Sequence, residues 1–192
     1  MRPSARQDPF PDLVARYSEP HRHYHVASHI ATCLALFDEV RSAVSDPVSL
    51  ELALWFHDAI YQPRASDNEE RSADLAVAAL HACDAESARA DRVKALILTT
   101  KRHEPTTTAD APWMLDIDLA VLGSSPEAFA AYDEGIRMEY SWMDPAEYRA
   151  KRADVLAAFL AKPRIYHTST FHDRFEQTAR RNLQRTRREL TR

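Results

Sequence analysis

The scarcity of glycine constrains the fold of this chain more than any other feature of the sequence, because only two of the 192 residues are glycine. Hairpin turns, β-bulges and phosphate-binding loops use glycine where φ is positive, a conformation that other residues adopt at a cost. Neither Gly123 nor Gly135 lies in a P-loop or a dinucleotide-binding fingerprint, so these two cofactor motifs are excluded. Alanine, the best helix former, occurs 31 times. The composition therefore predicts an all-α protein.

Capping residues mark several expected helix starts. Three pairs place an N-cap side chain before a proline at the first helical position: Asp46-Pro47, Ser125-Pro126 and Asp144-Pro145. Asp144 is followed by Glu147 in the spacing of a capping box, and Ser66 with Glu69 repeats that spacing. With apolar stripes of helical period, these signals predict about eight helices. The best-supported segments are 25–44, 47–61, 67–83, 85–102 and 145–161.

One domain over residues 1–192 is expected, because no Gly/Ser tract or long polar run separates the helical segments. Residues 1–12 contain three prolines and are expected to fray. No apolar run is long enough to cross a membrane, and the first residues lack the apolar core of a secretory signal. Cys33 and Cys83 form no disulfide pattern. We therefore expect a cytoplasmic protein with reduced thiols and no membrane partner.

Histidines gather near the N-terminus, where four of the nine lie within the string EPHRHYHVASHI. Neutral imidazole is a common ligand of transition metals, so the cluster is a candidate metal site. A surface loop leading into a helix would also explain it. His25 and His29 are four residues apart and would share one face of a helix. Apolar Ile30 follows His29, which places His29 at the edge of the expected core.

Aspartates interrupt two apolar segments, and burying an unpaired carboxylate is costly. His57 and Asp58 end the apolar run in ALWFHDAIY, and Asp116 and Asp118 lie within WMLDIDLAVLG. Each such carboxylate is expected to be paired, hydrogen-bonded or bound to a metal. A second Phe-His-Asp string at residues 171–173 begins an Arg-rich helix. Asp173 in that string needs no metal to explain it, because the helix dipole favours an acidic residue near the N-terminus of a helix.

The order of His29, then His57-Asp58, then Asp118 on successive helices resembles the HD superfamily of metal-dependent phosphohydrolases. The strings HYHVASHI, FHDAIY, DNEERSA and LDIDLAVLG are similar to a small, single-domain bacterial branch of predicted HD hydrolases. The resemblance runs from about residue 17 to residue 140. It implies an HD-domain-like helical bundle around a buried divalent ion, with His29, His57, Asp58 and Asp118 as ligands. Asp118 is preferred to Asp116 because D-x-x-x-L-G fits the family's closing aspartate.

The implied chemistry follows from the types of ligand. Mixed His/Asp coordination suits Mn, Fe, Co, Ni or Zn and permits Mg more weakly. Four protein ligands leave open positions on a six-coordinate ion, where a bound water has a lowered pKa and a phosphoryl oxygen is polarised. We therefore expect an enzyme that uses metal-activated water to hydrolyse a small phosphorylated metabolite, such as a nucleotide. Asp58 is expected to take part in catalysis as well as in metal binding.

Further polar residues lie next to these segments. Related enzymes place an acidic residue near the ion as general base, which makes Glu70 a candidate, although helix capping also explains an acid there. His103 is a candidate extra ligand or phosphate contact, since some HD enzymes carry additional histidines. Positive donors would bind phosphate. The candidates for substrate contact are Arg22, Tyr24, His25 and Lys101.

Three other functions fit parts of the same sequence. A di-iron oxygenase of the HD type would need His103 and a further His or Asp for a second iron. A non-catalytic module would bind a nucleotide without turning it over. The segment 170–192 carries seven arginines and three acidic residues, but its apolar stripe favours packing with the arginines outward, so nucleic acid is not the favoured partner. Exposed apolar helix faces would also permit a homodimer.

Overall fold

The structure, a computed structural model, describes residues 10–104 and 107–192. Within them the chain forms nine α-helices and two short 3₁₀ helices, and no strand. The predicted all-α class, with about eight helices, is confirmed. The chain divides into two compact units, Met1–Met114 (unit 1) and Leu115–Arg192 (unit 2), and the division falls within α6 (Ala111–Asp118). The single domain over residues 1–192 stays a prediction, because compactness alone does not establish which parts fold together.

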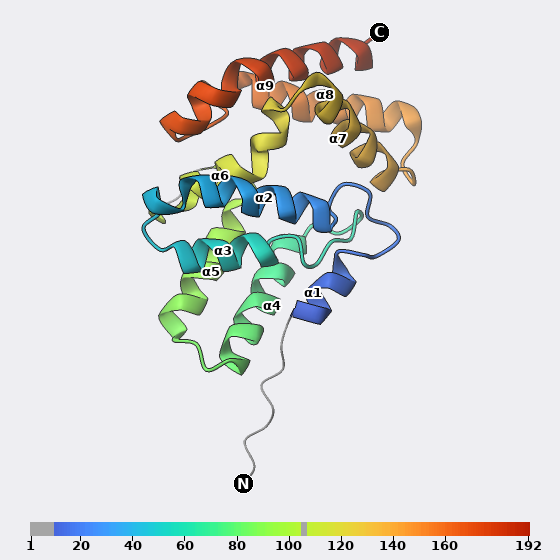
Figure 1. Cartoon of the computed structure of the whole chain (residues 1–192). Helices are drawn as coiled ribbons and strands as arrows, with labels where there is room; N and C mark the ends of the chain where they lie inside the picture. The colour runs from blue at the N-terminus through green and yellow to red at the C-terminus, as the bar shows by residue number, and fades with distance from the viewer. Residues whose placement is uncertain (1–9, 105–106) are drawn as a thin grey trace. The chain divides into compact units, whose positions relative to one another are not determined.

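Unit 1 is a helical cluster around an apolar core. Its helices are α1 (Phe10–Arg16), α2 (Ala27–Val40), the 3₁₀ helix η1 (Arg41–Ala43), α3 (Pro47–Phe56), α4 (Asn68–Ala82) and α5 (Ser87–Thr99). Helices α4 and α5 run side by side, α3 packs against both, and α2 also packs against α3 (Figure 1). The fully buried side chains at these contacts include Phe37, Leu50, Leu54 and Ile97. In the described part of the chain, no helix is long and apolar enough to cross a membrane.

Helix α1 differs from the fraying expected for residues 1–12. Residues 10–12 form its first turn, and Leu13 and Tyr17 are buried. The hydroxyl of Tyr17 donates a hydrogen bond of 2.8 Å to the carbonyl of Trp55, and Phe10 makes an edge-to-face contact with the Trp55 ring. These contacts with α3 hold α1 in place. Residues 1–9 lie outside the described residues.

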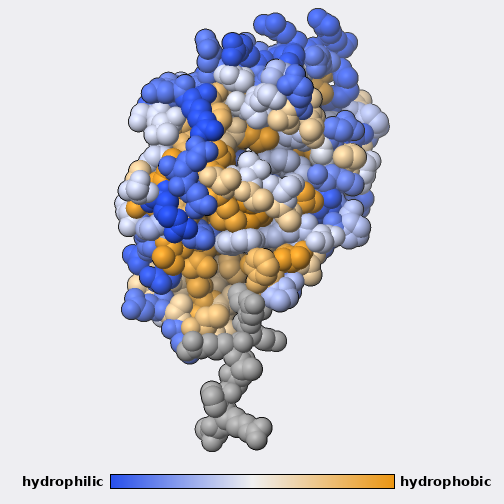
Figure 2. All heavy atoms as spheres, viewed as in Figure 1, coloured by the Kyte–Doolittle hydropathy of each residue, from blue (hydrophilic) through white to orange (hydrophobic). Residues whose placement is uncertain are grey.

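Unit 2 consists of the 3₁₀ helix η2 (Leu119–Gly123) and the helices α7 (Pro126–Glu139), α8 (Pro145–Ala161) and α9 (Ser169–Leu190). Helix α9 packs against α8 and against η2. Its buried side chains include Phe171, Ala179 and Leu183, and the face of α9 visible in Figure 2 is largely hydrophilic. The arrangement matches the expected packing of an apolar stripe with arginines outward.

The N-terminal caps expected from the sequence are present in three helices. Asp46, Ser125 and Asp144 each accept a hydrogen bond from a backbone N–H in the first turn of α3, α7 and α8. The predicted capping box at Ser66 is wrong, because α4 begins at Asn68. The side chain of Asn68 instead exchanges two hydrogen bonds of 3.0 Å with the backbone of Gln62, which fixes the start of the helix.

The end of α4 has the geometry that usually requires glycine. Asp84 follows the helix with φ of 57°. The N–H of Ala85 donates to the carbonyl of Leu80 at 3.0 Å, and the N–H of Asp84 donates to the carbonyl of His81 at 3.1 Å. This is a Schellman motif, whose left-handed position is normally a glycine. The chain therefore terminates α4 with a strained residue.

Replacing Asp84 with glycine is expected to raise the free energy of unfolding by about 0.5–1 kcal/mol, because glycine reaches positive φ without steric cost. Urea unfolding followed by circular dichroism measures the change. The matched control is Cys83→Gly in the same turn, where φ is −95° and glycine should lower stability. A loss of stability in Asp84→Gly would contradict this account of the turn.

Candidate metal centre

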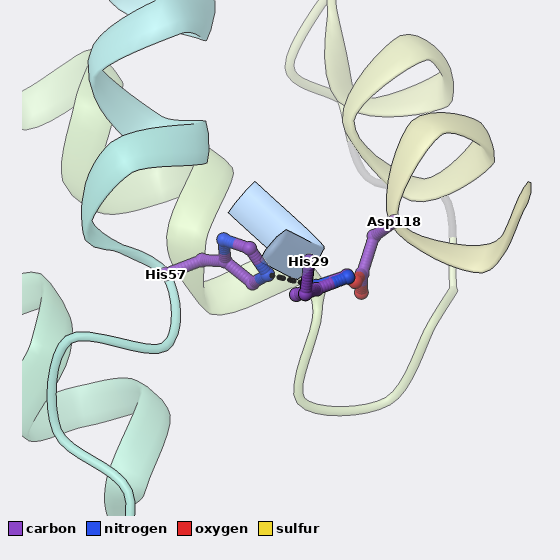
Figure 3. Close-up of side chains that lie close together, drawn as sticks. All are labelled: His29, His57 and Asp118. Atoms are coloured by element: carbon purple, nitrogen blue, oxygen red, sulfur yellow. Dashed lines mark hydrogen bonds between the residues drawn. The ribbon is translucent and has the colours of Figure 1, made fainter. Parts of the chain in front are cut away.

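Three predicted ligands of unit 1 come together at the start of α2 and the end of α3. His29 lies in the first turn of α2, and both His29 and His57 are buried. Their Nε2 atoms are 3.3 Å apart (Figure 3). Asp58 Oδ2 lies 3.0 Å from Nε2 of His57 and 3.5 Å from Nε2 of His29. Two imidazole nitrogens and one carboxylate oxygen therefore face a common point.

The end of α3 determines this geometry. The helix predicted over 47–61 stops at Phe56, so that prediction is wrong for the last five residues. His57 is the C-cap residue and still donates its N–H to the carbonyl of Ala53, whereas the N–H of Ala59 bonds to the carbonyl of Phe56 in a tight turn. On a continuous helix, neighbouring side chains project about 100° apart. The turn instead brings the side chains of His57 and Asp58 together.

Hydrogen bonds orient both imidazole rings. Nδ1 of His57 lies 2.9 Å from the carbonyl oxygen of Leu54. A carbonyl only accepts, so Nδ1 carries a proton and Nε2 is the nitrogen that faces the cluster; a cation would take the place of the proton on Nε2. Nδ1 of His29 lies 3.1 Å from the hydroxyl of Tyr24. This is the arrangement typical of metal-binding histidines, in which the second ring nitrogen is held by a neighbouring group.

Asp58 is held in its ionised form. Burial alone would raise its pKa, but the charges of His57, His25 and His29 and a hydrogen bond from His57 outweigh burial and hold the pKa well below its usual range. A carboxylate that stays ionised in a mostly buried position is an effective ligand for a cation. The electrostatics therefore agree with the geometry.

Asp118 is the last residue of α6 and belongs to unit 2. Its side chain is half-buried. The role of Asp118 as the fourth ligand stays a prediction.

Asp116, the other aspartate in this apolar segment, is satisfied by hydrogen bonds within the protein. Its carboxylate is fully buried and accepts hydrogen bonds of 2.7 Å from the N–H groups of His167 and Thr168 and one of 2.6 Å from the Thr168 hydroxyl. Burial raises its pKa, and these hydrogen bonds offset part of the shift. Thr168 is in turn the N-cap of α9. Asp116 is thus satisfied within unit 2 by the segment that begins α9.

The candidate substrate contacts near His29 have protein partners. Arg22 is buried and donates to Glu19 and to backbone carbonyls, which accounts for its charge without a substrate. Tyr24 contacts His29 through its hydroxyl, and the ring of His25 stacks on Tyr61 with centroids 4.1 Å apart. Tyr24 and His25 therefore lie beside the candidate metal centre, and their role toward a substrate stays a prediction.

Glu70 and Lys101, two further candidates from the sequence, form an ion pair with each other. The Lys101 ammonium pairs with the Glu70 carboxylate and donates to the carbonyl of Ser66 at 2.9 Å. The hydrogen bond from Lys101 lowers the pKa of Glu70. His103 follows α5 in the left-handed conformation, with φ of 49°. The general-base role of Glu70 and the ligand role of His103 stay predictions.

One neighbour of the site was not predicted from the sequence. The thiol of Cys33 is buried, with its sulfur 3.8 Å from both ring nitrogens of His29. The two residues are four apart on α2, and this spacing places them on the same face of the helix, which could have predicted the contact from the sequence. Both cysteines are free thiols, as the sequence predicted.

Comparisons of the chain with protein-family models, with curated proteins and with solved structures find no match. The resemblance to the HD superfamily therefore stays a prediction, and the geometry of the side chains carries the functional interpretation.

Removing the Asp116 carboxylate is expected to destabilise the protein without touching the metal centre. Asp116→Ala leaves three part-buried donors unpaired and should lower the free energy of unfolding by about 3 kcal/mol. Asp118→Ala is the matched control, because half-buried Asp118 should cost less than about 1 kcal/mol. Urea unfolding of both variants in the presence of a chelator measures the difference. Equal losses would contradict the division of roles between the two aspartates.

Proposed function

We propose that the chain binds a divalent transition-metal ion through His29, His57 and Asp58, with Asp118 as a fourth ligand. The spacing of the ligand atoms in unit 1 carries the proposal. Neighbouring ligands bonded to one ion at about 2.0–2.1 Å are separated by about 2.8–3.0 Å in octahedral geometry and by about 3.3–3.4 Å in tetrahedral geometry. The separations among the three atoms in unit 1 are 3.0, 3.3 and 3.5 Å. The atoms thus stand at nearly the distances that one shared ion requires.

The competing explanation is a buried polar cluster without a metal. Two imidazoles and a carboxylate can satisfy one another by hydrogen bonds alone. The direction of the rings favours a metal, because the outer nitrogen of each ring is already held by Leu54 or Tyr24. The inner nitrogen of each ring then faces the cluster, where one ion could bind both. The two explanations differ in one measurable respect, which is the metal content of the protein.

We further propose that the centre hydrolyses a small phosphorylated metabolite, such as a nucleotide, in the cytoplasm. A divalent ion there would lower the pKa of a bound water and polarise a phosphoryl oxygen. Asp58 is ionised and partly exposed, so it can also accept a hydrogen bond from the attacking water. Tyr24 and the Leu54 carbonyl hold the two imidazoles in orientation. The resemblance to HD phosphohydrolases supports this reaction and substrate class.

The metal proposal predicts about one transition-metal ion per chain in protein purified without chelators. His57→Ala should lose most of the metal, because it removes the nitrogen that faces both His29 and Asp58. His172→Ala is the matched control, since His172 also follows a phenylalanine and precedes an aspartate but contacts Arg164 and Glu176 in unit 2. Elemental analysis gives both the identity and the number of ions.

The same measurement separates the rivals. A wild-type protein that binds no Mn, Fe, Co, Ni or Zn, even after dialysis against each, leaves only the polar cluster. Two irons per chain would favour the di-iron oxygenase instead. Normal metal content in His57→Ala would show that the ion is held elsewhere.

The hydrolase proposal predicts release of inorganic phosphate from members of a nucleotide and sugar-phosphate panel. The reaction should require Mn, Co, Ni or Zn, and to a lesser extent Mg, and should fall by at least about 100-fold in His57→Ala. His172→Ala should keep the wild-type rate. No turnover by metal-loaded protein would count against the hydrolase. Nucleotide binding without turnover would instead support a sensing module.

A further inference from the structure

Arg22 is a buried cation beside the candidate metal centre. Its side chain is completely shielded from solvent and makes four directed hydrogen bonds. Nε donates to Glu19 Oε2 at 2.9 Å. The two terminal nitrogens donate only to backbone carbonyls. A guanidinium buried in this way is committed to the protein, so it is not available to bind a phosphate.

The carbonyls that Arg22 contacts belong to both chain segments that carry ligands of the candidate centre. Nη1 donates to the carbonyl of Asp58 at 2.7 Å and to that of His25 at 3.1 Å, and Nη2 donates to the carbonyl of Ala59 at 3.1 Å. Asp58 is itself a proposed ligand, and Ala59 follows it in the turn. The segment containing His25 leads into α2, where His29 lies. One guanidinium therefore joins the backbones that carry all three ligands of unit 1.

The early end of α3 explains why the carbonyls after it need a donor. Because α3 stops at Phe56, the carbonyls of Asp58 and Ala59 lie in a turn beyond the helix. Arg22 supplies hydrogen-bond donors to both. Its charge is balanced by Glu19, and the rings of Tyr17 and Tyr61 lie 5.3 and 5.5 Å from its guanidinium carbon. The guanidinium is thus held from several directions.

We propose that Arg22 is a positioning residue for the metal centre, an inference that rests on the proposed function. By fixing the backbone of Asp58 and Ala59 against the segment before α2, Arg22 keeps the Asp58 carboxylate at its distance from His29 and His57. The ligands are then arranged before an ion arrives, so little ordering remains to be done on binding. Lysine does not replace it, because a single ammonium does not have the planar fork that reaches three carbonyls and a carboxylate.

Unit 2 contains a matched arginine with no metal ligand nearby. Arg180 donates through Nε to Glu176 at 2.7 Å and through its terminal nitrogens to the carbonyls of Leu160, Lys162 and Pro163 at the end of α8. Like Arg22, it donates to one glutamate and to three backbone carbonyls. Arg180→Lys therefore reproduces the loss of hydrogen bonds without affecting a proposed ligand.

The test compares Arg22→Lys with Arg180→Lys in the full-length protein. Titration with Co²⁺ against a competing chromogenic chelator gives the affinity, and the visible spectrum of bound Co²⁺ reports its coordination. Arg22→Lys is expected to bind Co²⁺ about 10–100-fold more weakly and to change the Co²⁺ spectrum. Arg180→Lys should keep the affinity within about twofold and leave the spectrum unchanged, even where its melting temperature falls equally.

Each outcome decides one point. Wild-type protein that does not bind Co²⁺ overturns the proposed function itself. Wild-type binding with equal affinity and spectrum in folded Arg22→Lys overturns only the role of Arg22, and so does an equal loss of affinity in Arg180→Lys. If Arg22→Lys does not fold, Glu19→Gln decides, because it removes the carboxylate that aligns Nε and should weaken Co²⁺ binding severalfold. Unchanged affinity in Glu19→Gln then overturns the proposal.

Discussion

Helix ends are the constraint on which this structure depends, because a chain with two glycines must satisfy its terminal carbonyls in other ways. Arginine side chains do much of this. Arg180 bonds to carbonyls beyond α8, and Arg149 bonds to the carbonyls of Glu189 and Leu190 at the end of α9. Arg22 does the same for the turn after α3. Tertiary contacts thereby satisfy carbonyls at and beyond helix ends, and the turn after α3 carries two of the proposed ligands.

Three aspartates of the described residues that are buried or mostly buried show two kinds of arrangement. Asp110 and Asp116 each accept hydrogen bonds from backbone N–H groups and hold the start of another segment. Asp58 instead directs its Oδ2 atom at two imidazoles. The first kind is explained by folding alone, since each oxygen has a partner that the fold supplies. Only the second kind has the inward-facing nitrogen and oxygen atoms that a cation would use.

Much of the fold followed from local signals, whereas the finer geometry of the site did not. The caps at Asp46, Ser125 and Asp144 depend on residues within one turn, and sequence reasoning found them. The turn after α3 is held by Arg22, more than thirty residues earlier in the chain. The sequence identified His29, His57 and Asp58 as a set through resemblance. It did not show that a turn would bring them together.

The close contact between η2 and α9 restricts which residues can replace Gly123. A methyl group added at Gly123 would lie 2.6 Å from Cβ, 2.8 Å from the carbonyl oxygen and 3.0 Å from Cα of Phe175. Two of these atoms belong to the backbone, so no exchange of the residue at 175 would make room. A larger residue at position 123 would therefore require the backbone of α9 to move away from η2. The close contact thus fixes the position of η2, which follows Asp118, against α9.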